Sequence, residues 1–231
     1  MSMLPQLLEG AKVTVLVAVL AGCLAFGAAV TAGLCRLSGW RTVRTAAAVY
    51  VELFRGTSLL VQLFWLYFAL PFLGVELPKL PSAVLAVGLN FGAYGSEIVR
   101  SAILAVPKGQ WEAATALNMT SYDRMTRIIF PQAFVRMLPP FGNLMIELLK
   151  STSLVYFITL ADMTYQAMLL RNQYYPMTPY IFALLLLFYF VLAYIVSLCT
   201  RWLNEKRRRG GCSRCGIGNI RCKSCRSCSG H

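Results

Sequence analysis

Long apolar stretches of similar length constrain this chain more than any other feature. They fall near residues 13–35, 57–75, 81–104, 138–160 and 178–200. An α-helix rises about 1.5 Å per residue, so about 20 apolar residues cross the ~30 Å hydrocarbon core of a bilayer. The chain is 58% hydrophobic and only 13% charged, a composition that does not suit a soluble fold. We therefore expect an all-α, polytopic integral membrane protein with about five transmembrane helices.

The lysines and arginines predict the orientation of these spans, because basic flanking residues stay on the cytoplasmic side. One side would hold Arg36, Arg41, Arg44, Arg55, Arg100, Lys108, Arg124, Arg127, Arg136, Arg201 and residues 206–209. The other side would hold only Lys12, Lys79 and Arg171. We expect the N-terminus outside and the C-terminus in the cytoplasm. The formal charge of +13 then follows from topology, with membrane lipids rather than nucleic acid as the expected anionic partner.

The connection EAATALNMTSYDRMTRIIFPQA (112–133) lies on the predicted cytoplasmic side. A short helix is expected after Pro107, and it should end at Asn118, a residue type that tolerates left-handed backbone. Thr120 and Asp123 resemble a capping box, which predicts that a second helix begins there. Pro131 is expected to end that helix.

The second helix is amphipathic. Tyr122, Met125, Ile128 and Ile129 share one face, and arginines occupy others. Periodicity alone allows two interpretations, a helix lying on the membrane interface or a docking surface for another protein.

The residue pattern of 112–133 resembles the coupling-helix signature of bacterial ATP-binding-cassette importer permeases. The glycine usual at the turn is Asn118 here, and the phenylalanine usual in the second helix is Met125. Four other segments resemble the polar amino acid branch of that family: ELFRGTSLLVQLFW (52–65), GAYGSEIVR (92–100), VPKGQ (106–110) and LKSTSL (149–154). In the first of them, Ser58 stands where proline is usual. The resemblance extends from about residue 5 to about residue 208.

This resemblance implies a transport subunit with no catalytic residue of its own. The chain has no Gly-rich Walker-type loop for ATP phosphates. ATP and Mg would therefore bind to a separate dimer of ABC ATPase subunits. The other implied partners are a second permease subunit, identical or homologous, and an external solute-binding protein. The implied location is the bacterial inner membrane. The residues implied in ATPase coupling are Glu112, Ala113, Ala114, Leu117, Asn118, Met125 and Pro131. The Glu112 carboxylate would be the charged anchor, and Ala113 and Ala114 would pack into the ATPase groove.

The resemblance also implies the class of cargo. The polar amino acid branch carries polar amino acids and similar small zwitterions. Segments 54–65 and 112–119 look most similar to permeases for ectoine and hydroxyectoine, which makes ectoine the first candidate.

Polar residues inside the apolar runs mark a candidate substrate path, since such groups usually face a partner or an aqueous cavity. They are Gln62, Asn90, Glu97, Asn143, Glu147 and Lys150. Glu97 precedes Arg100 by three residues, as Glu147 precedes Lys150, so each pair could form an intrahelical ion pair with only a structural role. The uncharged amides could hydrogen-bond a zwitterion.

Two other function classes stay open. A self-contained channel or secondary transporter would need an inverted repeat or paired broken helices, and the sequence gives no convincing case of either. A membrane scaffold without transport is disfavoured by polar residues at several depths.

The residues after Arg209 differ sharply in composition. We expect a membrane domain over 1–208 and a basic tail rich in Cys, Gly and Ser over 209–231. Two Cys-x-x-Cys units suggest zinc ligands, but their short spacing and the lack of apolar residues favour a disordered extension. The candidate ligands are Cys212, Cys215, Cys222, Cys225, Cys228 and His231.

Overall fold

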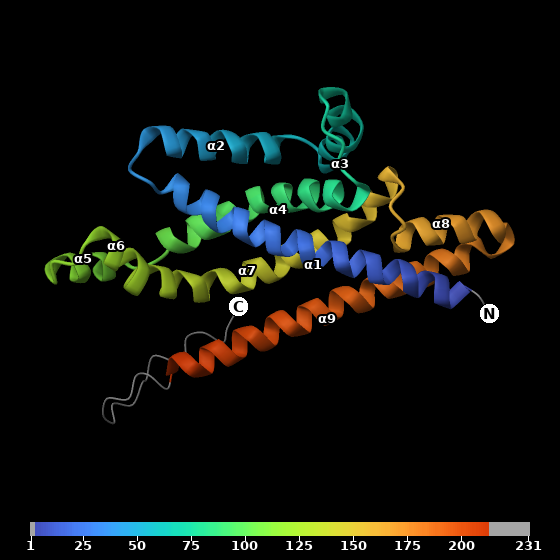
Figure 1. Ribbon diagram of the computed structural model, residues 1–231. Helices are drawn as coiled ribbons and strands as arrows, with labels where there is room; N and C mark the ends of the chain where they lie inside the picture. Colours follow the sequence, from blue (N-terminus) through green and yellow to red (C-terminus); the bar gives the residue numbers. More distant parts are fainter. Residues whose placement is uncertain (1–2, 213–231) are drawn as a thin grey trace.

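Four long helices give the protein its shape. The computed structural model describes residues 3–212, with side chains for residues 5–202, and this part of the chain is helical without strands. The long helices share one general direction (Figure 1): α1 (Met3–Arg36), α4 (Lys79–Leu104), α7 (Phe130–Ser151) and α9 (Thr178–Cys212). The predicted all-α fold is confirmed.

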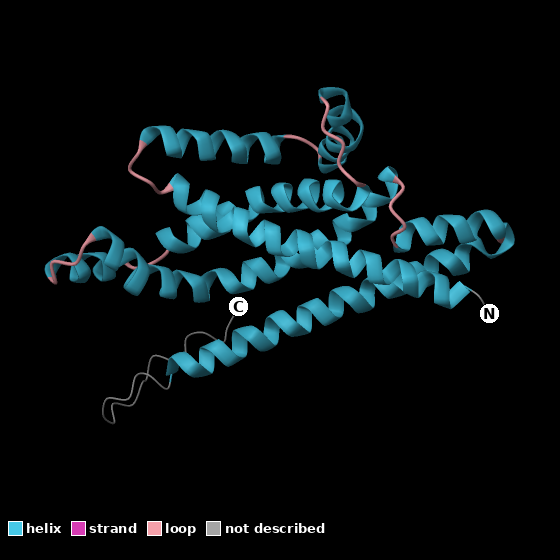
Figure 2. Cartoon of the chain, in the orientation of Figure 1, coloured by secondary structure: helices cyan, strands magenta, loops and turns pink. Residues whose placement is uncertain are grey.

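Shorter helices join them through brief loops (Figure 2). The first connection contains α2 (Arg41–Gly56), α3 (Leu59–Phe64), the π-helix η1 (Trp65–Ala69) and the 3₁₀-helix η2 (Leu70–Leu73). The second contains α5 (Lys108–Ala116), α6 (Ser121–Asp123) and the π-helix η3 (Arg124–Ile129). The third contains η4 (Thr152–Ile158), α8 (Met163–Gln173) and η5 (Tyr175–Met177).

Glycines bring α1 and α4 unusually close together. A Cβ on Gly95 would lie 2.7 Å from the Cβ of Ala29, and one on Gly92 would lie 2.7 Å from that of Ala28. In a bilayer no hydrophobic driving force pushes helices together, so close backbone approach through small residues is a main source of packing energy. This contact forms the centre of the bundle.

The buried residues form a main core, a smaller cluster and a group of three, Ala32, Val51 and Ala93, where α1, α2 and α4 meet. The main core joins α1, α4 and α7 with α3, η3 and η4, and includes Leu63, Phe91 and Met137. The smaller cluster lies where α1, α8 and α9 meet, and consists of Leu7, Met163, Ala167, Leu170 and Ile181.

The structure corrects the predicted span at 57–75. Instead of one straight helix, Arg41–Gly56 and Leu59–Leu73 form a pair bent by 103°. A search for apolar runs does not detect α2, because charged residues such as Arg44 and Glu52 interrupt its sequence. Tyr50 and Val51 nevertheless pack α2 against the bundle. Figure 1 shows α2 alongside α4 and α3 turned across the bundle.

The predicted span at 138–160 starts too late. The helix runs without a break from α6 through η3 and α7 to Ile158, and a bend of 54° then separates it from α8. Within the part of the chain that the structure describes, three single helices are long and apolar enough to cross a membrane, and the number reaches five if each bent pair is one span. The number of spans therefore agrees with the expected five, but their boundaries and bends differ from the expectation.

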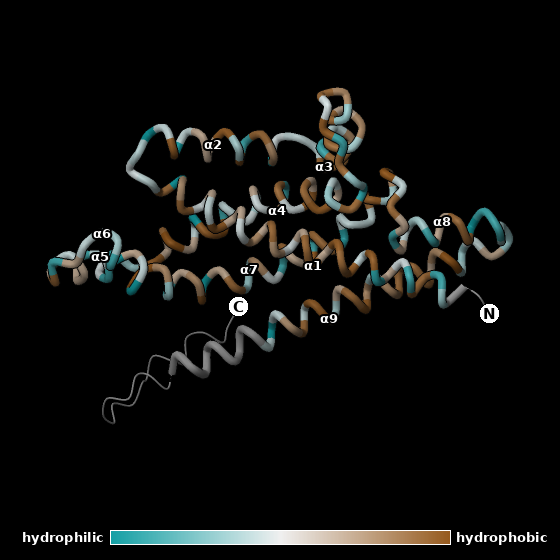
Figure 3. Tube along the Cα trace, in the orientation of Figure 1, coloured by the Kyte–Doolittle hydropathy of each residue, from teal (hydrophilic) through white to brown (hydrophobic). Residues whose placement is uncertain are grey.

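Hydrophilic residues gather at both ends of the bundle, with apolar residues between them (Figure 3). The connection holding α5 and α6 lies at one end, and the N-terminus lies at the other. The structure thus places the 112–133 connection beyond the apolar part of the bundle.

Candidate functional site: an exposed helical element and a polar pocket

The turn of the 112–133 connection has the predicted backbone. Pro107 precedes α5, and Leu117 follows it as the C-cap residue. Asn118 has a φ of 54°, in the left-handed region that Asn tolerates better than other residues with a side chain. Its amide donates to the Thr115 carbonyl (2.9 Å), so the turn closes the end of α5.

The second helix begins with the predicted cap. The Asp123 amide donates to Thr120 Oγ1 (3.2 Å), and this hydroxyl donates to the Asp123 carboxylate (2.7 Å). The carboxylate also pairs with Arg127 Nε at 3.2 Å. The start of the helix is therefore determined by local side chains.

The expectation that Pro131 ends this helix is wrong. In η3 the Phe130 amide donates to the Met125 carbonyl, five residues back, and α7 continues through Pro131. A proline in a regular helix clashes with the carbonyl four residues earlier and lacks an N–H to donate. The π-helix ends at Ile129 and α7 begins at Phe130, so Pro131 lies in the first turn of α7 directly after the wider turn.

Arg124 ties the two helices of this element together. Its guanidinium carbon lies 5.4 Å from the centroid of the Trp111 ring, and Nη1 donates to Thr115 Oγ1 (3.1 Å). Trp111, Met125 and Ile128 pack against the main core. The sequence placed Arg124 off the apolar face but gave no sign of this contact with α5.

Two more contacts involve α7: one joins it to α5, and the other joins it to the end of α4. Gln132 Nε2 on α7 donates to Gln110 Oε1 on α5 (3.2 Å). The Arg136 guanidinium on α7 donates to the Ala105 carbonyl, which caps α4. We call residues 108–129 the coupling element, after the coupling-helix signature that this segment resembles.

The outer surface of the coupling element is polar with two apolar side chains. Glu112 and Ala113 are exposed, and Glu112 has no ion pair or side-chain hydrogen bond with any described residue. Leu117 and Tyr122 are 73% and 77% exposed, so Tyr122 does not pack inward with Met125 and Ile129 as the periodicity predicted.

Ala114 is fully buried, which corrects the expectation that it packs into a partner. Its neighbour Ala113 points outward because successive residues differ by about 100° around a helix. Of the predicted contact residues, Glu112, Ala113, Leu117 and Asn118 are exposed, and Met125 packs against the core.

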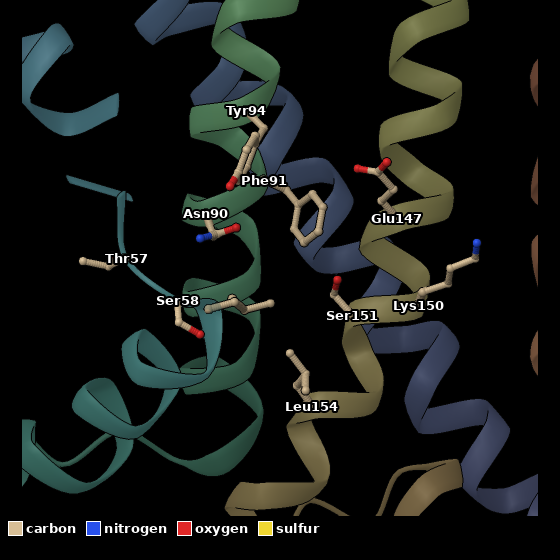
Figure 4. A pocket seen from close by; sticks show the side chains of 10 residues that line it. Thr57, Ser58, Asn90, Phe91, Tyr94, Glu147, Lys150, Ser151 and Leu154 are labelled. Atoms are coloured by element: carbon tan, nitrogen blue, oxygen red, sulfur yellow. The ribbon is translucent and has the colours of Figure 1, made fainter. Parts of the chain in front are cut away.

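A polar pocket of about 520 Å³ opens between α4, α7 and the turn before α3. Figure 4 shows its lining: Thr57, Ser58, Leu59, Asn90, Phe91, Tyr94, Glu147, Lys150, Ser151 and Leu154. Three predicted path residues, Asn90, Glu147 and Lys150, come together here from different helices.

Gln62 and Asn90 bind each other and the end of α2. Asn90 Nδ2 donates to Gln62 Oε1 (3.0 Å) and to the Phe54 carbonyl (2.9 Å). Gln62 Nε2 donates to the same carbonyl (2.9 Å) and to Thr57 Oγ1 (2.6 Å). The two amides therefore hold the bend between α2 and α3, and Asn90 also reaches the pocket.

Glu97 forms the predicted ion pair with Arg100 (2.9 Å) and a second one with Arg36 on α1. Helical spacing predicts only the first, because Arg36 lies far away in sequence. The shared carboxylate joins α1 to α4, and the group carries one net positive charge.

Glu147 and Lys150 do not form the predicted ion pair; the three ion pairs among the described residues involve other acids. In Figure 4 the Lys150 ammonium group points away from the Asn90 side of the pocket. Asn143, Glu147 and Lys150 are instead exposed on one side of α7, with Arg136 further along the same side. We call these four residues the polar stripe.

The tail ligands lie largely outside the described residues. Only Cys212 is inside, at the end of α9, and Cys215, Cys222, Cys225, Cys228 and His231 are not. The part of the chain that the structure describes has no group of three or more metal-ligating side chains.

A spanning helical bundle with a polar pocket and an exposed element at one end defines an integral membrane component of a transport system. Over residues 15–209 the sequence matches the binding-protein-dependent transport system inner membrane components, and the chain belongs to that family. It is a multi-span transport subunit, not an enzyme.

Relatives and solved structures agree with this assignment. The chain is 47% identical over 189 residues to a probable amino-acid ABC transporter permease of Sinorhizobium fredii, covering 76% of this chain and 79% of the relative. It is 35% identical over 210 residues to the glutamine transport system permease protein of Escherichia coli K12, covering 89% and 94%. A crystal structure of an amino acid ABC transporter with histidines matches with a TM-score of 0.80 and 33% identity, over 87% of this chain and 94% of that one. The inward-facing MetNI methionine transporter shares the fold, with a TM-score of 0.73 and 17% identity over 89% and 99%.

Proposed function

We propose that this chain is the membrane permease of an ATP-driven, binding-protein-dependent importer, coupled to separate ATPase subunits through the coupling element. The observation that carries the proposal is the exposed Glu112 carboxylate on an element that also exposes Leu117 and Tyr122. This element is bonded to α7 through Gln110, and α7 is bonded to the end of α4 through Arg136. An exposed charge and large exposed apolar side chains on one element suit a protein partner. Movement of that partner would be passed to α4 and α7, which line the pocket.

The pocket and the polar stripe are the proposed substrate path. Asn90 and Tyr94 on α4 face Glu147 on α7 across the pocket, and such residues are costly in a bilayer unless they meet water or a partner. We propose that a second permease subunit, identical or homologous, covers the polar stripe. Substrate would then pass between the two subunits after delivery by an external binding protein.

The proposed cargo is a polar amino acid or a similar small zwitterion. Relatives named for glutamine, cystine, arginine and nopaline transport support this class. Ectoine is the first candidate from the sequence motifs. The binding protein encoded beside this chain, titrated with glutamine, arginine, cystine and ectoine, would identify the cargo, and tight binding of an uncharged sugar alone would contradict the class.

Glu112→Lys tests the coupling. In proteoliposomes containing the whole transporter, we expect the ATPase to dissociate from the membrane or to hydrolyse ATP without uptake. Glu76→Lys is the matched control, since Glu76 is also exposed but lies in the loop before α4. Wild-type uptake by Glu112→Lys would count against the proposal. ATP-independent uptake by the purified chain alone would favour a channel or secondary transporter.

A further inference from the structure

An apolar groove lies between α1, α7 and α9. It encloses about 540 Å³. The lining residues are almost entirely apolar: Val15, Ala18, Val19, Gly22, Cys23, Phe26, Met145, Leu148, Leu149, Leu192, Ile195 and Val196. Small residues on α1 make the hollow, and Gly22 leaves room beside the Met145 sulfur.

The groove is closed at one end and widens toward the other. At the outer end, near the N-terminus, the smaller cluster joins α1, α8 and α9. From there α9 diverges from α1 toward its own C-terminal end (Figure 1), while remaining against α7, where a Cβ on Gly142 would lie 2.9 Å from Thr200. The floor of the groove is therefore α7.

The groove and the polar stripe lie on opposite sides of α7. At about 100° per residue, Met145, Leu148 and Leu149 point roughly opposite to Glu147 and Lys150. The side proposed to meet a second permease is thus the polar one. The groove faces away from it, toward the bilayer.

The wide end of the groove leads to a basic helix end. Arg201 on α9 is exposed and lies nine residues after the groove residue Leu192, a rise of about 13.5 Å. This is close to half of the ~30 Å hydrocarbon core. The sequence adds Lys206 and residues 207–209, all arginine, further along the same helix.

We propose that this groove binds one acyl chain of an anionic phospholipid from the cytoplasmic leaflet, with the headgroup phosphate against Arg201. The inference rests on the proposed orientation of the spans. The apolar lining takes the chain, the length from Leu192 to Arg201 matches one leaflet, and the basic helix end complements the negative headgroup. A second copy of the chain is the competing occupant.

Photolabelling of the full-length chain with its transporter subunits tests this proposal. The probe is phosphatidylglycerol with a diazirine on its acyl chain, in vesicles of phosphatidylethanolamine and phosphatidylglycerol. We expect labelled peptides from α1 around Cys23 and from α7 around Leu148. Arg201→Gln should lower this labelling by about fivefold, the size expected for one basic residue near an anionic surface. A phosphatidylcholine probe with the same acyl chain should label the wild-type groove as weakly as the phosphatidylglycerol probe labels the Arg201→Gln variant.

Filling the groove provides the second variant. Cys23→Phe or Val15→Phe, both at exposed positions of the lining, should abolish labelling there while α9 residues around Leu186 stay labelled. Leu187→Phe is the matched control, since Leu187 is 55% exposed and outside the groove.

Three outcomes would overturn the proposal: groove labelling no stronger than at Leu186, labelling unchanged in the filled variants, or a cross-link from Cys23 to a second copy. Uptake is measured in the same vesicles. Active transport without groove labelling refutes the lipid site alone, and groove labelling without ATP-dependent uptake refutes the proposed function alone.

Discussion

Ser58 occupies a position where its family resemblance suggests proline, and its backbone already suits one. Its φ is −69° and its ψ is 136°, close to the φ of about −65° that proline imposes. The preceding Thr57 is extended, at φ −112° and ψ 150°, as the residue before a proline must be. The bend between α2 and α3 thus keeps a proline-like geometry without the proline.

Ser58→Pro should therefore stabilise the protein by about 0.4–1 kcal/mol, because it restricts the unfolded chain without straining the folded one. Thermal unfolding in detergent would show a raised Tm. The matched control is Thr57→Pro, whose φ of −112° a proline cannot adopt, so its Tm should fall. A lower Tm for Ser58→Pro would contradict this account of the bend.

The left-handed backbone at Asn118 gives a second prediction. Asn118→Gly should keep both stability and ATPase retention, whereas Asn118→Val should cost about 1–2 kcal/mol, the penalty of a left-handed conformation. Co-purification of the ATPase with each variant, together with its Tm, measures the effect. Equal retention by the Val and Gly variants would mean that the turn does not set the angle of the second helix.

Local patterns were predictable at this scale and distant contacts were not. Asn118 and the Thr120–Asp123 cap depend on neighbouring residues, so the sequence predicts them. The Arg36–Glu97 pair joins residues 61 apart in sequence, and the bond between Gln62 and Asn90 depends on how α2 turns into α3. Neither follows from spacing along one helix, since only the packing of α1 and α3 against α4 brings those side chains together.

Among the elements, the contact of α1 with α4 leaves little room for added volume. Gly95→Ile should destabilise the bundle by about 1–3 kcal/mol, because overpacking forces backbone shifts where a new Cβ would already lie 2.7 Å from Ala29. Gly27→Ile on α1 is the matched control, as a Cβ there would meet no atom within 4 Å.

Detergent-solubilised yield and Tm would compare the two variants. We expect the Gly95 variant to unfold earlier and the Gly27 variant to behave as wild type. Similar losses in both would indicate that isoleucine harms these helices irrespective of the contact between them.

At the scale of the whole molecule, the two polar ends of the bundle should lie on opposite sides of the membrane. Ser121→Cys and Glu76→Cys place thiols at exposed positions of opposite connections, in a chain whose native cysteines are replaced by serine or alanine. A membrane-impermeant maleimide should label the Glu76 variant in intact spheroplasts, and the Ser121 variant only after permeabilisation. The reverse pattern would invert the proposed orientation.

Hydropathy predicts the number of spans better than their outline. α2 carries arginines and a glutamate, and it is stabilised by packing against α4 rather than by continuous apolarity. The bends of 103° and 54° depend on tertiary contacts that a search for apolar runs does not detect.

The π turn of η3 has a consequence for chain length. It takes about one residue more than an α turn does, and α5 and α6 precede it while the polar stripe follows it. Deleting a single residue such as Thr126 would let this turn become α-helix without changing the number of turns, so Glu112 would keep about the same direction relative to α7. Deleting one residue from the regular helix of α7 would instead rotate Glu112 by about 100° relative to the residues that follow the deletion. The direction in which Glu112 is presented is thus determined by the number of helical turns, and a wider turn can take up one extra residue without changing it.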